Sequence, residues 1–310
     1  MRVTIVHNPS AGHEGLTRAD LTAAIERAGH QPVYCSTDDG NLDRALEQPG
    51  ELVVAAGGDG TVRAVATRLA GRRQLMTVLP LGTANNIARS LGIDGDPRGL
   101  IERWGAAVRR PFDLGWVRAP WGTSAFVEGV GFGPSVGAIA TLTHVEATPS
   151  PDRDPREELE RDLRVFRELL ADHPAHECRA RVDGRDVSGE YLLVEAMNIR
   201  TIGPNLELAS DADPADGQLD LVLVGDAQRP ALREYVTARL EGRRAVLGLP
   251  RHRGRHIEVS WPGSRVHVDD QIQPDEADTA SGRWWRDERP VTLDVSIDRH
   301  ALEFLVPAGS

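Results

Sequence analysis

The sequence predicts two domains of different class, an α/β domain followed by an antiparallel β domain. In the first third of the chain, short apolar runs alternate with segments whose apolar residues recur at helical spacing. From about Phe112 onwards, short alternating runs separated by turn residues replace this pattern, and Asp183-Gly184 marks a hairpin. With 310 residues, the chain is long enough to form two hydrophobic cores.

The first domain has the pattern of a parallel sheet covered by helices on both faces. Its predicted strands are the apolar runs 3–6, 32–36, 52–56 and 75–79, and its predicted helices cover about 21–28, 41–48, 62–69 and 87–91. Ligands of such sheets bind at the carboxyl ends of the strands. The glycine-bearing loops after these strands lie at that edge.

The second domain is predicted to consist of short strands around one helix. The strands are the runs 112–117, 124–128, 178–182, 191–194, 219–224 and 256–259. A polar, proline-rich loop over 148–155 precedes a helix whose apolar stripe contains Leu159, Leu163, Phe166 and Leu170.

The segment Gly57-Gly58-Asp59-Gly60-Thr61 stands between the strand 52–56 and the helix 62–69. Glycines at a strand-to-helix turn remove every Cβ from the place where the first N–H groups of the helix point outward, so a phosphate can approach closely. Asp59 is unusual beside an anion. It is either a helix cap or part of a metal or phosphoryl-transfer site.

The amino-acid composition limits the kinds of binding partner that we expect for this protein. Acidic residues outnumber basic ones by 47 to 36, and the net charge of -11 argues against nucleic acid as the main partner. Cys35 and Cys178 form no CxxC pair, which fits a reducing cytoplasm. No signal peptide and no run of about 18 apolar residues is present, so we expect a cytoplasmic protein with at most peripheral contact to a transient membrane surface. The sequence leaves open whether the chain forms a homodimer.

Three motifs in order, Asn8-Pro9-Ser10-Ala11-Gly12, Gly57-Gly58-Asp59-Gly60-Thr61 and Pro80-Leu81-Gly82-Thr83-Ala84-Asn85, resemble the diacylglycerol kinase catalytic-domain family, which includes bacterial lipid kinases and sphingosine kinases. The resemblance implies ATP-dependent phosphorylation of a lipid hydroxyl. It also implies a doubly wound, NAD kinase-like α/β domain over 1–116, with 300–310 returning to it, and a C-terminal β-sandwich over 117–299. The nucleotide would bind in the cleft between them.

The resemblance also assigns site residues. Those that would bind ATP are Asn8, Thr37, Gly57, Gly58, Asp59, Gly60, Thr61, Arg63, Gly82, Thr83 and Asn85. For Asn8 and Thr37 the alternative is capping of their own loops. Asp216, with Asp213 nearby, matches the magnesium position of the family, and carboxylates suit Mg²⁺. The alternative for Asp216-Gly217 is a simple turn.

The chain departs from the family where a catalytic Glu is expected after a strand. Val266-His267-Val268 leads into Asp269-Asp270-Gln271, and an amide at Gln271 cannot accept a proton. Three alternatives follow: a substitute carboxylate, an impaired kinase or pseudoenzyme, or a changed reaction. The candidate substitutes are Asp269, Asp270, Asp275 and Glu276. Because alternate side chains of a strand share a face, Asp269 is favoured over Asp270 unless a turn redirects the chain.

Two features suggest contact with lipid. Trp284-Trp285, flanked by Arg283 and Arg286, is either a membrane-interface anchor or part of the domain packing. An arginine cluster either faces anionic lipid or is a solvated face; its members are Arg239, Arg243, Arg244, Arg251, Arg253 and Arg255. The leading function is a lipid kinase, and the alternatives are an NAD kinase and a nucleotide- or lipid-binding pseudokinase.

Overall fold

The computed structural model describes residues 1–11, 16–146, 154–263, 265–274 and 290–308. Four parallel strands form the sheet of the first domain in the order β2-β1-β3-β4. They are β1 (Arg2–His7), β2 (Gln31–Ser36), β3 (Leu52–Gly57) and β4 (Leu75–Pro80). β3 is buried along its whole length, as expected for a strand covered on both faces.

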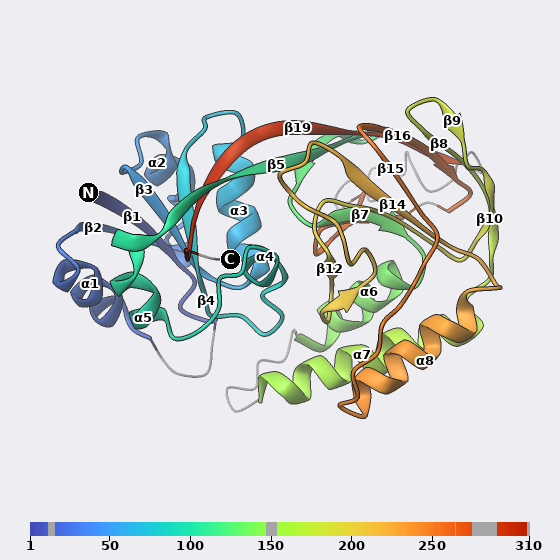
Figure 1. Cartoon of the computed structure of the whole chain (residues 1–310), viewed down its shortest axis with the longest axis horizontal. Helices are drawn as coiled ribbons and strands as arrows, with labels where there is room; N and C mark the ends of the chain where they lie inside the picture. The colour runs from blue at the N-terminus through green and yellow to red at the C-terminus, as the bar shows by residue number, and fades with distance from the viewer. Residues whose placement is uncertain (12–15, 147–153, 264, 275–289, 309–310) are drawn as a thin grey trace.

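Helices cover both faces of this sheet. α1 and α5 lie on one side of the strands, and α2 and α3 lie on the other (Figure 1). The helical segments are α1 (Arg18–Arg27), η1 (Thr37–Asp39), α2 (Leu42–Glu47), α3 (Asp59–Leu69), α4 (Asn86–Ser90), α5 (Pro97–Glu102) and η2 (Trp104–Ala106).

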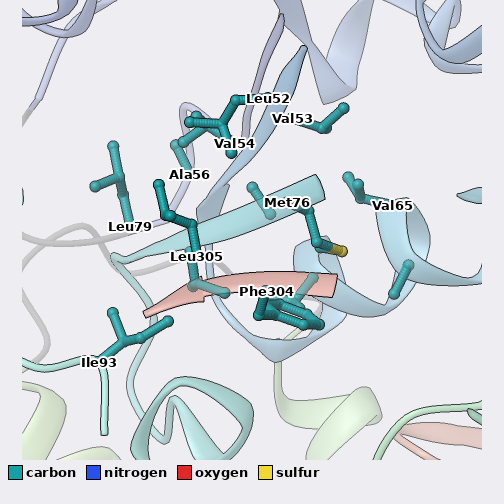
Figure 2. Close-up of a cluster of buried hydrophobic side chains, with 14 of the residues drawn as sticks. Leu52, Val53, Val54, Ala56, Val65, Met76, Leu79, Ile93, Phe304 and Leu305 are labelled. Carbon is teal, nitrogen blue, oxygen red and sulfur yellow. The ribbon is translucent and has the colours of Figure 1, made fainter. Parts of the chain in front are cut away.

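Two long strands run through both domains, as Figure 1 shows. They are β5 (Val108–Ala119) and β19 (Val291–Val306), which pair with each other in antiparallel orientation. The last residues of β19 also pair in parallel with β4, so the C-terminal end of the chain extends the sheet of the first domain. Figure 2 shows the result, with Phe304 and Leu305 of β19 packed among side chains of β3, β4 and α3. Residue 116, the expected end of the first domain, lies inside β5.

The second domain contains two packed sheets. The long sheet continues from β19 into β16 (His256–Trp261), β8 (His176–Val182) and β10 (Gly189–Tyr191), with β6 (Gly122–Phe126) on β5 and β9 (Arg185–Asp186) on β8. The other sheet has the order β15 (Arg251–Gly254), β14 (Leu219–Val224), β11 (Leu193–Met197), β7 (Gly129–Phe132), β17 (Val266–Val268) and β18 (Gln271–Gln273). A small hairpin joins β12 (Thr201–Ile202) to β13 (Leu206–Glu207).

The sandwich core lies between these two sheets, and helices cover the outer face of the second one. In β14, Leu219 and Leu221 belong to the sandwich core, whereas Val222 and Val224 pack with the helices. The helices are α6 (Pro134–Glu146), α7 (Pro155–Asp172) and α8 (Arg229–Leu240). The predicted fold class, an α/β domain with a β-sandwich domain, is confirmed. Within the described residues, no helix is long and apolar enough to cross a membrane.

One predicted strand is two strands in the structure. The run Tyr191–Val194 is split at Leu192, because β10 pairs with β8 in the long sheet while β11 pairs with β14 and β7 in the other sheet. A continuous apolar run cannot reveal that the chain changes sheets in its middle.

Candidate active site

Two glycine turns from neighbouring strands touch each other. Gly57 ends β3 and Gly58 precedes α3, while Gly82 follows β4. A Cβ on Gly58 would lie 3.2 Å from the Cα of Gly82, and a Cβ on Gly82 would lie 2.5 Å from the Cα of Gly58. Only glycine allows this approach. The first N–H groups of α3, which have no acceptor within the helix, therefore lie beside a second backbone turn, where a phosphate fits.

Asp59 caps a helix, but a different one from the helix that it begins. Its Oδ2 accepts a hydrogen bond from the N–H of Asn86 at 2.9 Å, and its Oδ1 accepts one from Ile87 at 3.0 Å. Both residues lie in the first turn of α4. Burial raises the pKa of Asp59, and these two N–H groups oppose the rise. Asp59 thus fixes α4 against the turn after β3 while also lining the cavity described below.

Several polar side chains of the motifs are engaged in their own loops. Oδ1 of Asn8 accepts a hydrogen bond from the N–H two residues later at 3.0 Å. Asn85 bonds twice to Gly82, through Oδ1 to the N–H at 3.0 Å and through Nδ2 to the carbonyl at 2.5 Å. The hydroxyl of Thr83 donates to Glu158 of α7 at 2.7 Å. These bonds shape the loops and engage the N–H groups of Ser10 and Gly82.

The remaining side chains predicted to bind ATP lie around α3 and at the end of β2. Thr61 is buried and turned back toward Gly57, where an added Cβ would lie 2.3 Å from its Oγ1. Thr37 begins η1 after β2. Arg63 forms an ion pair with Asp270 of the second domain, with 2.8 Å between Nε and Oδ1. Arg63 therefore connects the glycine turn to the segment that departs from the family.

That segment turns sharply at Asp269. The residue has a φ of +53°, and its carboxylate accepts hydrogen bonds from the N–H groups of Val127, Glu128 and Gly129 at 2.8–3.2 Å. Burial raises the pKa of Asp269 to about 6, although these donors oppose the rise. Because the turn breaks the strand alternation, the exception to the argument for Asp269 over Asp270 applies, and the oxygens of Asp269 hold the chain.

Asp270, not Gln271, faces the glycine turn. Oδ2 of Asp270 lies 3.0 Å from the position that a Cβ on Gly60 would occupy. Asp270 also lines the cavity, whereas Gln271 begins β18, pairs with Val268 and is exposed. The other two candidate bases, Asp275 and Glu276, lie outside the described residues.

A cavity of about 200 Å³ lies between the two domains, next to Gly60 and Asp270. Its polar end contains Asp59, Gly60, Asn86 and Asp270. Its other walls are mainly apolar and come from α6, α7 and the β12–β13 hairpin, although Ser135, Asp162 and His267 also line them; the apolar residues include Ala138, Ile139, Leu142, Phe166, Ile202 and Leu206. Such a cavity suits a molecule with one polar end and a hydrocarbon body.

Glu128 also lines the cavity, and the sequence did not single it out. Its Oε2 accepts a hydrogen bond from Nδ2 of Asn86 at 3.2 Å. Burial, together with the charges of Asp59, Asp269 and Asp270, raises the pKa of Glu128 well above its ordinary value. The available signal was an acidic residue directly after the apolar run that ends at Val127. Its proximity to Asp59 depends on tertiary structure.

The two predicted metal ligands are both paired with arginine. Asp213 lies 2.8 Å from Nη2 of Arg110, and Asp216 contacts Arg253. Among the residues that the structure describes, no group of three or more His, Cys, Asp or Glu side chains could hold a metal ion. The carboxylates of Asp213 and Asp216 do not fit Mg²⁺ unless these guanidinium contacts break. Their assignment as magnesium ligands stays a prediction.

Three of the six arginines of the cluster, Arg243, Arg251 and Arg253, pair with carboxylates of described residues. Arg243 pairs with Glu234 and Glu241, and Arg251 contacts Asp211. Arg239 donates to the carbonyl of Asn205. The tryptophan pair 284–285 and its flanking arginines lie outside the described residues.

Comparisons with known proteins agree with the geometry. Residues 2–117 match the family model described as the diacylglycerol kinase catalytic domain, and residues 150–276 match the YegS C-terminal NAD kinase beta sandwich-like domain. A protein named diacylglycerol kinase from Bacillus subtilis is 29% identical over 78% of this chain and 79% of its own. A Staphylococcus aureus protein of the same name is 27% identical over 78% and 76%.

Solved structures show the same fold. A diacylglycerol kinase from Bacillus anthracis superposes with a TM-score of 0.70 at 15% identity, over 99% of this chain and 97% of that one. Yeast NADH kinase, solved with NADH, superposes with a TM-score of 0.53 at 10% identity, over 99% and 83%. With both domains matched in order and the glycine turns in place, residues 2–117 belong to the diacylglycerol kinase catalytic-domain family, and residues 150–276 match the YegS C-terminal NAD kinase beta sandwich-like domain.

Proposed function

We propose that this protein is an ATP-dependent lipid kinase that phosphorylates the hydroxyl of a diacylglycerol-like or sphingosine-like lipid. The observation that carries the proposal is the cavity: its polar end meets the glycine turn at Gly60, and most of the remaining lining side chains are apolar. An NAD kinase would need mainly polar walls for a second sugar and base, whereas α6 and α7 line this cavity mostly with apolar side chains such as Ala138, Leu142 and Phe166.

In the proposed reaction ATP supplies the phosphoryl group. The turn at Gly57 and Gly58 holds the phosphates through backbone N–H groups. The lipid hydroxyl lies at the polar end of the cavity, where Asp270 accepts its proton as the new O–P bond forms and ADP leaves. Arg63 orients Asp270 through their ion pair. Asp269 supports this arrangement by tying the turn to the link between β6 and β7, which carries Glu128.

Asp270 is a suitable base because it is accessible and only partly neutralised. Its side chain is 53% exposed and has one ion-pair partner, whereas the carboxylate of Asp269 is enclosed by backbone donors. The role of base would therefore fall on the residue before Gln271, which occupies the position of the catalytic Glu in the family. A lipid substrate also implies that the protein works at a membrane surface, where it takes the lipid from the bilayer.

A transfer assay with labelled ATP tests the proposal. Purified protein is incubated with a diacylglycerol in mixed micelles, with a long-chain amino alcohol, with NAD or without acceptor. Label in a lipid product supports the proposal. Label in NAD would favour an NAD kinase, and nucleotide binding without any transfer would favour a pseudokinase; either result contradicts it.

A variant that narrows the cavity tests the lipid site separately. Ala138→Phe places a ring inside the cavity, so we expect the KM for lipid to rise about tenfold, as for ~1.4 kcal/mol of lost binding, with ATP affinity unchanged. Thr141→Phe is the control, because Thr141 is exposed on the same helix. Equal KM values for both variants would place the lipid elsewhere.

A further inference from the structure

A histidine and a glutamate meet inside the second sheet because a glycine stands between them. On β7, Gly131 is the neighbour of His267 on β17 and also of Glu195 on β11. A Cβ on Gly131 would lie 2.0 Å from Oε2 of Glu195. The missing side chain lets the two residues reach across β7, where Nε2 of His267 lies 2.7 Å from Oε2 of Glu195. Both side chains are buried.

The other ends of this pair are also engaged. Nδ1 of His267 lies 2.9 Å from the carbonyl oxygen of Asp269, and the hydroxyl of Ser135 donates to Oε1 of Glu195 at 2.6 Å. Both ring nitrogens of His267 therefore face oxygen atoms. A carbonyl can only accept, so Nδ1 carries a hydrogen, and the contact with Glu195 needs a second proton between Nε2 and Oε2.

The groups around His267 favour its protonated form. Burial by itself lowers the pKa of His267, but the charge of Glu195, its hydrogen bond and the contacts with Asp269 together raise it. The neighbours of His267 on the adjacent strands are Gly131 and Ile272, which do not titrate. The groups that face the ring are thus Glu195, Asp269 and the Ser135 hydroxyl.

We propose that His267 is a positioning residue for the phosphoryl transfer: paired with Glu195, it holds the carbonyl of Asp269 and so fixes the left-handed turn that presents Asp270 to the cavity. The inference rests on the proposed function for its consequence in catalysis. The backbone at Asp269 is held from two directions, by its carboxylate on residues 127–129 and by the His267 ring on its carbonyl. Such a turn has little freedom, which suits a group that must meet a hydroxyl.

The protonation state of His267 determines in which direction activity should change with pH. Because the pKa of His267 is raised in the folded protein, the contribution of His267 to holding the turn is fully present below the ordinary value of 6.5 and is lost as the pH rises through the raised value. Above it, the unprotonated Nε2 faces the carboxylate of Glu195. The turn then loosens, and turnover falls on the alkaline side.

Nuclear magnetic resonance of the full-length wild-type protein tests the arrangement without any mutation or assay. We expect the His267 ring nitrogens to titrate with a midpoint above 6.5, and the amide of Asp270 to shift with the same midpoint. His256, which pairs with Asp294 at 2.8 Å on the surface, is the internal comparison, and its titration should leave the Asp270 amide unmoved. A midpoint at or below 6.5, or an Asp270 amide that does not follow His267, overturns the inference even if no substrate is ever phosphorylated.

Kinetics then test the consequence. The double variant His267→Asn, Glu195→Gln keeps an amide donor near the Asp269 carbonyl but removes the titrating pair. We expect kcat to fall about tenfold or more, since small misplacements of reacting groups are costly, with KM values within about twofold and the alkaline loss of activity abolished. His256→Asn is the control and should behave like wild type. An unchanged kcat and an unchanged alkaline limb in a folded double variant would contradict the proposal, whereas an inactive wild type would instead refute the proposed function.

Discussion

The glycine turns of the first domain and the Asp269 turn of the second domain bound the same cavity, yet they are held by different means. The glycine turns at Gly58 and Gly82 lie at the ends of adjacent parallel strands and touch through their backbones. The Asp269 turn is held by side chains and N–H groups from three separate strands. The first arrangement depends on missing side chains and the second on buried charge, so the two should fail differently when they are altered.

The largest effect is expected in the glycine turn. In Gly58→Val, a Cβ would lie 3.2 Å from the Cα of Gly82, and the added methyl groups would occupy the space that a phosphate needs. We expect ATP affinity to fall at least about 100-fold, or ~2.7 kcal/mol, in calorimetric titration. Gly248→Val is the control, since nothing lies within 4 Å of a Cβ there. Unchanged affinity in Gly58→Val would move the nucleotide away from this turn.

A substitution in the Asp269 turn should instead lower the stability of the folded protein. Asp269→Gly tolerates the φ of +53° but removes the acceptor of three buried N–H groups, so we expect the free energy of unfolding to fall by about 2–4 kcal/mol in denaturant titration.

Asp270→Ala sharpens this second test. The Arg63–Asp270 pair is partly exposed, and such pairs contribute at most about 1 kcal/mol. If Asp270→Ala were as destabilising as Asp269→Gly, the two neighbouring carboxylates would not have the separate roles described here.

The smallest effect concerns divalent cations. Asp213 and Asp216 are neutralised by Arg110 and Arg253, so removing Mg²⁺ with a chelator should leave the thermal unfolding midpoint of the nucleotide-free protein unchanged. Differential scanning calorimetry with and without chelator measures this. A lower midpoint in chelator, absent from an Asp216→Asn variant, would show that the metal displaces the arginine contacts.

The sequence predicts the elements whose signal is local. The strand and glycine turn around Gly57, and the apolar stripe of α7, lie where the pattern places them. The predictions missed α6 and α8. α6 is apolar with little amphipathic contrast, so its period is hard to see, and α8 packs only part of its surface on α7 and the sheet.

The candidate site divides in the same way. Its glycines follow from the motifs, but the roles of Asp269 and Asp270 depend on one residue with positive φ, which a strand alternation argument cannot anticipate. Glu128 and Glu195 are 67 positions apart in the sequence, and His267 is also distant from both in the sequence. The contact between Glu195 and His267 arises from strand pairing through β7, whereas Glu128 meets Asn86 only because the two domains lie side by side.

The central claim is that Asp270, rather than Gln271, accepts the proton of the lipid hydroxyl. Single-turnover transfer from ATP to lipid by Asp270→Asn and by Gln271→Glu, beside wild type and with ATP affinity measured for each, tests it most directly. We predict that Asp270→Asn slows transfer by about 10²–10⁴-fold with ATP affinity retained, and that Gln271→Glu changes the rate little because residue 271 is exposed outside the cavity. Full activity in Asp270→Asn, or a large gain in Gln271→Glu, would contradict the account.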